Sequence, residues 1–330
     1  MIKKRESYLC LSAMLRAREP RLLNAEKASR MLDASSFDEA AKLLTDCGYE
    51  DMSGMDATQV ETALLAHKAE IFSEIDHLAP DRLIPDIFRM KYDYHNAKVI
   101  LKAEATGSQP DTLLSAAGRI SPAELKGHYN EEKYSALPGR LGEAMKQAKE
   151  TLARTANPQL ADFLLDREYF REITEAARSS GNAFLQGYAR ILIDSSNLKS
   201  AIRTRRMGKG RDFLLDALSE GGSVSVDRLL NASDKEALAS LFAHTELEKA
   251  AQLGAEAMDG GRLTAFERAC DNAVNAYLGK AKLISFGSEP LTAYLAAVEN
   301  EITAVRMILT GRLAGLKSEV IKERLRDLYA

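Results

Sequence analysis

The segment DYHNAKVILKA, residues 93–103, returns about a hundred residues later as DSSNLKSAIRT, residues 194–204. A shift of the sequence by 101 residues aligns three polar residues with identical ones, namely Asp93, Asn96 and Lys98 with Asp194, Asn197 and Lys199. The same shift aligns Leu113 and Leu114 with Leu214 and Leu215. Self-similarity at a fixed spacing is the signature of an internal repeat. The pattern therefore predicts that the chain uses one helical unit more than once.

The repeat continues after a three-residue insertion and has a weaker third copy. Beyond the insertion, Ile120-Ser121 aligns with Val224-Ser225. In ENEITAVRMILTGRLAG, residues 299–315, Glu301 and Arg306 stand where Asp93 and Lys98 stand in the first copy, whereas Ala304 replaces Asn96. Three units of about 100 residues are each large enough for a small core. We expect helical repeat domains at 1–125, 126–230 and 231–330, related by a pseudo-threefold axis.

The composition favours helices throughout the chain. The 330 residues are 45% apolar and 28% charged, with no Trp and eight Pro. Ala, Leu, Glu, Lys and Arg, the residues that lose least side-chain entropy in a helix, are abundant. Only LIPDIF (83–88) and SVSV (223–226) alternate as strands do, and both are short. The fold class predicted is all-α.

Helix starts are marked by capping residues. A Ser or Asp followed three residues later by Glu or Gln can form a reciprocal capping box, and Pro suits the first helical position. Such signals occur at Ser36–Glu39, Asp56–Gln59, Ser121–Glu124, Asn157-Pro158 and Ser233–Glu236. After Ser36, the apolar spacing predicts a helix that continues to Cys47 and stops at Gly48.

The charge and cysteine content exclude several classes of protein. The formal net charge of −3 gives no overall attraction to nucleic acid or to an acidic membrane surface. Cys10, Cys47 and Cys270 are far apart, which favours a reducing cytoplasm over a disulfide framework. No run of 18 or more uncharged apolar residues is present, so no membrane-spanning helix is expected.

No pattern in the sequence predicts catalysis, a cofactor or a metal site. The glycines of MGKGRD (207–212) and GRLGEAMK (139–146) have neither the spacing nor the preceding strand of a phosphate-binding loop. The five histidines are scattered singly, and no Ser or Cys has a local nucleophile signature. An all-α enzyme is accordingly the least supported interpretation.

Cations near the repeated helices are the candidate partner-binding residues. Lys98/Lys102 and Lys199/Arg203 are spaced i,i+4, and RTRRMGKGR (203–211) is the densest basic stretch. The cations of RTRRMGKGR either gather at a helix C-terminus ahead of Gly208, where the dipole favours them, or bind an acidic protein partner. The paired cations either bind such a partner or have an internal role, in which Asp93 and Asp194 neutralise neighbouring helices. Nucleic acid is disfavoured because no aromatic residues are interleaved. The candidates are Lys98, Lys102, Lys199, Arg203, Arg205, Arg206 and Lys209.

Four blocks together resemble one known family. They are YLCLSAMLRAREPRLLNAEKASRML (8–32), KYDYHNAKVILKA (91–103), DREYF (166–170) with YARILIDSSNLKSAIRTRRMG (188–208), and NEITAVRMILTGRLAGLKSEVIKERLRDLY (300–329). The chain is similar over essentially its whole length to the connecting subunit of V-type and A-type rotary ATPases. That subunit is called C in prokaryotes and d in eukaryotes.

The resemblance implies a non-catalytic coupling protein without cofactors. Members of that family are all-helical funnels of three similar domains, and they sit on the cytoplasmic face of the membrane rotor ring. Their central opening receives the shaft of D- and F-type central-stalk subunits, and they transmit torque between ATP turnover and proton or sodium transport. The alternative is a helical-repeat scaffold that binds another protein partner. The coupling interpretation involves neither nucleic acid nor direct nucleotide binding.

Overall fold

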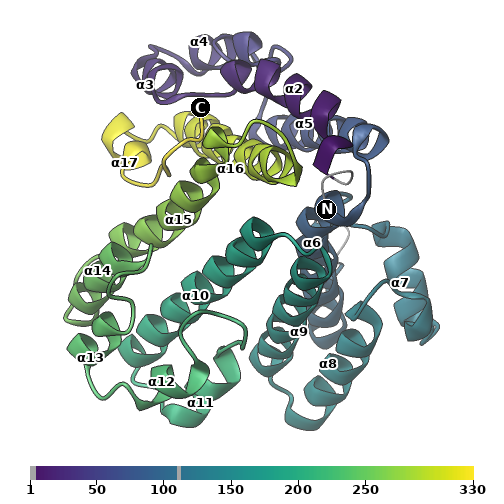
Figure 1. Cartoon of the computed structure of the whole chain (residues 1–330), viewed down its shortest axis with the longest axis vertical. Coiled ribbons are helices and arrows are strands. Elements are labelled where there is room, and N and C mark those ends of the chain that lie inside the picture. Colours follow the sequence, from purple (N-terminus) through teal and green to yellow (C-terminus); the bar gives the residue numbers. More distant parts are fainter. Residues whose placement is uncertain (1–4, 110–112) are drawn as a thin grey trace. The chain divides into compact units, whose positions relative to one another are not determined.

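The computed structural model describes residues 5–109 and 113–330, and in this part of the chain the regular elements are helices with no strand (Figure 1). The all-α prediction is confirmed. The chain divides into two compact units, one formed by residues up to Pro85 together with Arg262–Ala330, the other by Asp86–Gly261. The three domains expected from the repeat, and their pseudo-threefold relation, stay predictions.

The first unit combines the two ends of the chain. Its α-helices are α2 (Leu9–Arg18), α3 (Ala25–Asp33), α4 (Phe37–Lys42), α5 (Ala57–Leu78), α15 (Leu263–Gly279), α16 (Ser288–Leu313) and α17 (Ser318–Lys322). Short 3-10 turns occur at Glu19–Arg21, Thr45–Cys47 and Lys280–Leu283. Helix α16 is the centre of this unit, because it packs against α5 and α2. Its buried side chains include Val298, Ile302, Val305 and Leu309.

The second unit contains the middle of the chain. Its α-helices are α6 (Leu83–Thr106), of which residues from Asp86 onward belong here, α7 (Pro122–Asn130), α8 (Leu141–Thr155), α9 (Pro158–Ser179), α10 (Ala183–Arg206), α11 (Arg211–Ala217), α12 (Val226–Asn231), α13 (Lys235–Ser240) and α14 (Glu248–Met258). A 3-10 turn occurs at Tyr134–Ala136. Helix α9 packs against both α8 and α10.

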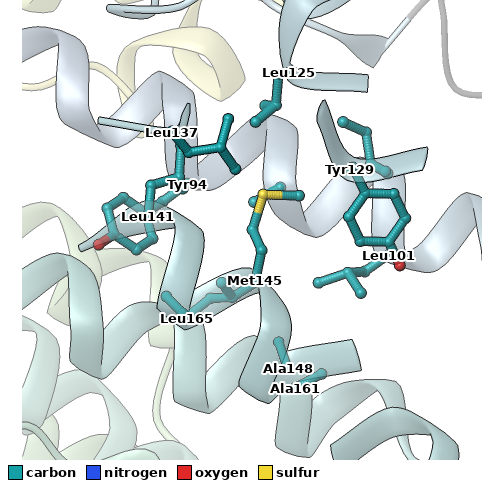
Figure 2. Packing of buried hydrophobic residues seen from close by; sticks show 13 residues of the cluster. Tyr94, Leu101, Leu125, Tyr129, Leu137, Leu141, Met145, Ala148, Ala161 and Leu165 are labelled. Atoms are coloured by element: carbon teal, nitrogen blue, oxygen red, sulfur yellow. The ribbon is translucent and has the colours of Figure 1, made fainter. Parts of the chain in front are cut away.

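One core of the second unit lies among α6, α7, α8 and α9. Figure 2 shows Met145 of α8 between side chains of the neighbouring helices, with Tyr94 and Leu101 of α6 and Leu165 of α9 around it. All of these side chains are buried. Burying apolar side chains contributes about 1.5–3 kcal/mol for each large one, so this cluster holds the four helices as one body.

The predicted helix starts are confirmed where the capping chemistry is complete. Asp56 accepts hydrogen bonds from the backbone N–H groups of Thr58 and Gln59, and the Gln59 side chain accepts from the Asp56 N–H. Ser121 and Glu124 form the same reciprocal box at α7. Pro158 occupies the first position of α9, as expected from its fixed φ angle.

The end of one helix and the start of another differ in detail from the prediction. Helix α4 ends at Lys42 rather than reaching Cys47, because the chain tightens into i→i+3 hydrogen bonds such as Leu44 N–H to the Ala41 carbonyl. Gly48 then closes a 3-10 turn with a φ of 89°. At α13 the cap is Asp234 and not Ser233, since Asp234 accepts from the Ala237 N–H.

The helix lengths follow the repeat. Helices α5 and α9 each have 22 residues and begin at positions separated by the 101-residue offset. The helices that follow them, α6 and α10, each have 24 residues. The sequence identity around Asp93 and Asp194 is therefore part of a repeated pair of long helices.

Candidate functional site

The repeated asparagines hold a loop against their helices. The Asn96 side chain donates to the Ser115 carbonyl and accepts from the Ser115 N–H, both at 2.8 Å. The Asn197 side chain makes the same pair of bonds with Ser219, at 2.8 and 2.9 Å. Each amide thus satisfies both backbone groups of one serine in the chain that returns beside the helix. The repeat at these positions is explained by loop anchoring.

The repeated aspartates hold the same loops a few residues further on. Asp93 accepts from the backbone N–H groups of Arg119 and Ile120. Asp194 accepts from the N–H groups of Ser223 and Val224 and from the Ser223 hydroxyl. Both carboxylates are buried. A buried carboxylate is tolerated where hydrogen bonds of this kind replace its water.

Two glycines complete these anchors. A Cβ atom on Gly118 would overlap the Asp93 carboxylate, and one on Gly222 would overlap the Asp194 carboxylate. The two glycines align in the register that follows the three-residue insertion. Sequence reasoning missed them, although this register carried the signal. Their role is to let the loop backbone approach a buried acid.

The first anchor is joined to a charged network. The Arg119 guanidinium pairs with Asp93 at 2.6 Å and with Glu172 of α9 at 2.5 Å. Tyr94 donates its hydroxyl proton to Glu172 at 2.8 Å. Burial raises the pKa of the Asp93 carboxyl, and the contacts with Arg119 oppose that rise. The second anchor has Ser223 in place of Arg119, so its acid is held by neutral donors.

The third copy keeps the buried acid with different partners. Glu301 of α16 accepts from the Leu23 N–H at 2.5 Å and from the Tyr49 hydroxyl at 2.8 Å. These contacts tie the segment before α3 and the segment between α4 and α5 to the central helix of the first unit. Ala304, which replaces the repeated asparagine, is buried. The third copy of the repeat therefore shares with the first two a buried acid that accepts a hydrogen bond from a backbone N–H group.

Glu301 is expected to make the first unit less stable as pH rises. Burial raises the pKa of the Glu301 carboxyl from 4.5 to about 7, against the lowering effect of its hydrogen bonds. Between these values the folded chain binds the proton and the unfolded chain has lost it, so the free energy of unfolding falls with pH by up to about 3 kcal/mol. Glu301→Gln removes this contribution.

Urea unfolding of both proteins at pH 4.5 and pH 8 measures the effect. Glutamine cannot ionise, and its amide NH₂ group replaces one of the two oxygens that accept from the Leu23 N–H and the Tyr49 hydroxyl. The native chain should be the more stable of the two at pH 4.5, and the difference should shift toward the variant at pH 8. An unfolding difference that is the same at both pH values would exclude the buried proton.

The repeated lysines of the first copy bind acids within the fold. Lys98 pairs with Asp166 of α9 and Lys102 with Asp162, each at 2.6 Å. Because the acid numbers fall as the lysine numbers rise, α6 and α9 run antiparallel at this contact. The i,i+4 spacing of the lysines is thus matched by i,i+4 acids, which offsets their mutual repulsion.

A matching ion pair occurs on α16. Arg306, which stands where Lys98 stands in the first copy, binds Glu61 of α5 through two bonds of 2.6 and 2.9 Å. At the 101-residue offset, Glu61 occupies the place of Asp162. In the second unit, cations of α6 therefore pair with acids of α9, and in the first unit a cation of α16 pairs with an acid of α5.

Two arginines of RTRRMGKGR donate hydrogen bonds to carbonyls near the ends of other helices. Arg205 donates to the carbonyls of Ala232 and Asp234, just after α12, at 2.5 and 3.3 Å. Arg206 donates to the carbonyls of Ala257 and Gly261, at the end of α14, at 3.1 and 2.8 Å. The last carbonyls of a helix lack partners within it, and these guanidinium groups supply them. The expected place at a helix C-terminus is confirmed, since Arg203, Arg205 and Arg206 lie in the last turn of α10. Arg205 and Arg206 also bind carbonyls near the ends of α12 and α14.

The other candidate cations also have neighbours. Lys209 lies over the Phe213 ring, with its ammonium nitrogen 5.9 Å from the centroid. Lys199 and Arg203 take part in interactions as well. Every candidate cation therefore has an internal contact. Binding of a partner by these residues stays a prediction.

Two features are absent from the part of the chain that the structure describes. Within residues 5–109 and 113–330, no group of three or more His, Cys, Asp or Glu side chains is placed to hold a metal ion. In the same ranges, no helix is long and apolar enough to cross a membrane.

Comparison with known proteins matches the chain over nearly its whole length. The family model of the ATP synthase (C/AC39) subunit matches residues 11–324. The C subunit of the V-type sodium ATPase of Enterococcus hirae is 27% identical over 330 residues, which cover 98% of this chain and 99% of that protein. The C subunit of the A-type ATP synthase of Methanocaldococcus jannaschii is 26% identical over 350 residues, covering 97% and 86%. The chain belongs to the ATP synthase (C/AC39) subunit family.

Proposed function

We propose that this protein is a non-catalytic central-rotor subunit of a V/A-type ATPase. It links the shaft of D- and F-type central-stalk subunits to the membrane rotor ring and transmits torque between ATP turnover and proton or sodium transport. It works at the cytoplasmic face of the membrane as a peripheral subunit. The observation that carries the proposal is the family match over residues 11–324, since relatives of the same length are subunits of rotary ATPases.

The anchors suit a part that has to transmit force. A rotor element must not deform when one surface is turned against a load on another. Within the second unit, Asp93, Asn96, Asp194 and Asn197 each bind the backbone of the following loop, and the Arg119 pairs join α6 to α9. Close-packed interiors have low compressibility and transmit strain. These contacts give each long helix a fixed position relative to its loop.

Binding to the central stalk tests the proposal. The purified chain is mixed with D- and F-type subunits of the same organism, and the mixture is followed by size-exclusion chromatography with light scattering. A complex with one copy of this chain per shaft is expected. If the shaft does not bind, even at low salt where charge contacts are least screened, and the chain is absent from rotary ATPase purified from native membranes, the proposal is wrong.

Lys209 gives the cleanest test of the cationic surface. Charge reversal of Arg205 and Arg206 would also break their carbonyl contacts, whereas Lys209 is exposed and lies against Phe213. If this region faces an acidic partner, Lys209→Glu should weaken the shaft complex severalfold and reduce its salt dependence.

Lys146→Glu on α8 is the matched control, because Lys146 is also exposed and the charge change is the same. The affinity of both variants for the shaft is measured at two salt concentrations. Equal affinities of the two variants would place the partner surface elsewhere.

A further inference from the structure

We propose that a cavity between α9, α10 and the loop at Gly221-Gly222 binds a phosphate group. The cavity has a volume of about 180 Å³ and lies entirely within the second unit. Its polar lining consists of Thr174, Arg178, Gln186, Arg190, Gly221 and Gly222. The proposal does not rest on the coupling function.

The two arginines of the cavity differ from the others near the repeated helices. Arg178 and Arg190 are exposed, and within residues 5–109 and 113–330 neither guanidinium has an ion pair or a hydrogen bond. By contrast, Arg205 and Arg206 each donate two hydrogen bonds to carbonyls. Two unpaired guanidinium groups at one cavity repel each other, and a shared anion removes that repulsion.

The cavity lining has the chemistry that a phosphate group requires. Arginine binds phosphate through parallel N–H donors in a planar fork, and two such forks can satisfy several of its oxygens. The Gln186 amide, whose side chain makes no hydrogen bond within the described ranges, adds two further donors. Gly221 and Gly222 add no side chain to the lining, because the space of a Cβ is taken by Ile193 and Thr174 at Gly221 and by the Asp194 carboxylate at Gly222.

The spacing along the helices directs both arginines to the cavity. Thr174 and Arg178 are four residues apart on α9, and Gln186 and Arg190 are four apart on α10, so each pair lies on one helix face. The position of Arg178 in the last turn of α9 is also favoured by the helix dipole. Arg190 is in the eighth position of α10, where the dipole gives no such reason.

The acids near the cavity limit the affinity without occupying the arginines. Asp194 approaches Gly222, but its carboxylate already accepts from Ser223 and Val224. Glu175, on the same helix as Arg178, pairs with Arg140 at 3.1 Å. Glu220 is exposed beside Gly221. A group with two negative charges is therefore favoured over a singly charged carboxylate, because it gains more from the two cations.

Phosphorus NMR of inorganic phosphate tests the site in the full chain. At constant ionic strength, the native protein should broaden the phosphate resonance saturably. The double variant Arg178→Gln with Arg190→Gln should bind at least about tenfold more weakly, since both forks are lost. Lysine at both positions should retain part of the affinity. The control is Arg154→Gln with Arg228→Gln, which removes two exposed arginines of the same unit and should stay within about twofold of the native protein.

A second titration distinguishes a phosphate group on a lipid headgroup from a free phosphate ester. Vesicles containing phosphatidic acid present a phosphate monoester at a lipid surface, and inorganic phosphate at saturation should displace the chain from them if the cavity takes the headgroup. Vesicle binding that is unaffected by phosphate or by the double variant would leave free phosphate esters as the ligand. Absence of saturable phosphate binding by the native protein, or equal binding by all variants, would overturn the proposal.

Discussion

Asp93→Ala is expected to lower the free energy of unfolding of the second unit by about 3–5 kcal/mol, the usual cost of breaking a buried ion pair from one side. The carboxylate is fully buried, and it accepts from the Arg119 guanidinium and from two backbone N–H groups. Removing it leaves these donors without their partner, while Arg119 keeps its pair with Glu172. The loop that ends at α7 should then open locally.

Asp194→Ala provides the internal comparison. This aspartate is held by the neutral donors of Ser223 and Val224, so its loss should cost about 2–3 kcal/mol, the range for buried hydrogen-bonding groups left unsatisfied. Glu256→Ala, at an exposed position of α14, should stay within about 0.5 kcal/mol of the native chain. Urea unfolding gives the free energies, and amide hydrogen exchange in residues 113–125 and 217–230 locates the loss. Equal effects of Asp93→Ala and Glu256→Ala would refute the anchor.

Gly222→Ala and Gly118→Ala are the second pair of changes with large expected effects. Each new methyl group would overlap the carboxylate of the adjacent anchor, so the loop or the aspartate must move. We expect a loss of about 2–4 kcal/mol for each, from a displaced buried carboxylate with broken hydrogen bonds. Neither glycine has a positive φ, so the cost comes from overlap and not from backbone strain.

Gly127→Ala is the matched control on α7. No atom lies within 4 Å of a Cβ at Gly127, and the residue is inside a helix. Alanine there should stabilise the chain by about 0.4–1 kcal/mol, because it restricts the unfolded state. Thermal unfolding of the three variants measures the contrast. If Gly222→Ala were as stable as Gly127→Ala, the close approach of loop and aspartate would not exist.

The sequence was sufficient to predict the features that depend on local chemistry or on repetition. The helix starts at Asp56, Ser121 and Pro158 could be predicted, because a helix cap is formed by residues only a few positions apart. Asp93 and Asn96 were found because their copies make the same contacts at the same spacing. The family resemblance was confirmed for the same reason, since it depends on the order of blocks along the whole chain.

Features that depend on the tertiary fold were not predictable. The bond between Arg119 and Glu172 joins residues that no repeat relates, since the second copy has Ser223 at the matching place. Arg205 and Arg206 lie in the last turn of their own helix, as predicted. The carbonyls that they also bind, just after α12 and at the end of α14, are brought close only by packing. The amino-acid type alone does not distinguish an exposed arginine from one that binds a carbonyl.

The most direct test of the coupling function measures ion transport and ATP hydrolysis together. Membranes from cells that lack this chain are compared with membranes to which the purified chain has been added back. We expect hydrolysis without ATP-driven ion accumulation in its absence, and restored accumulation after addition. ATP-driven transport at the native rate without the chain would contradict the proposed role as the link between shaft and ring.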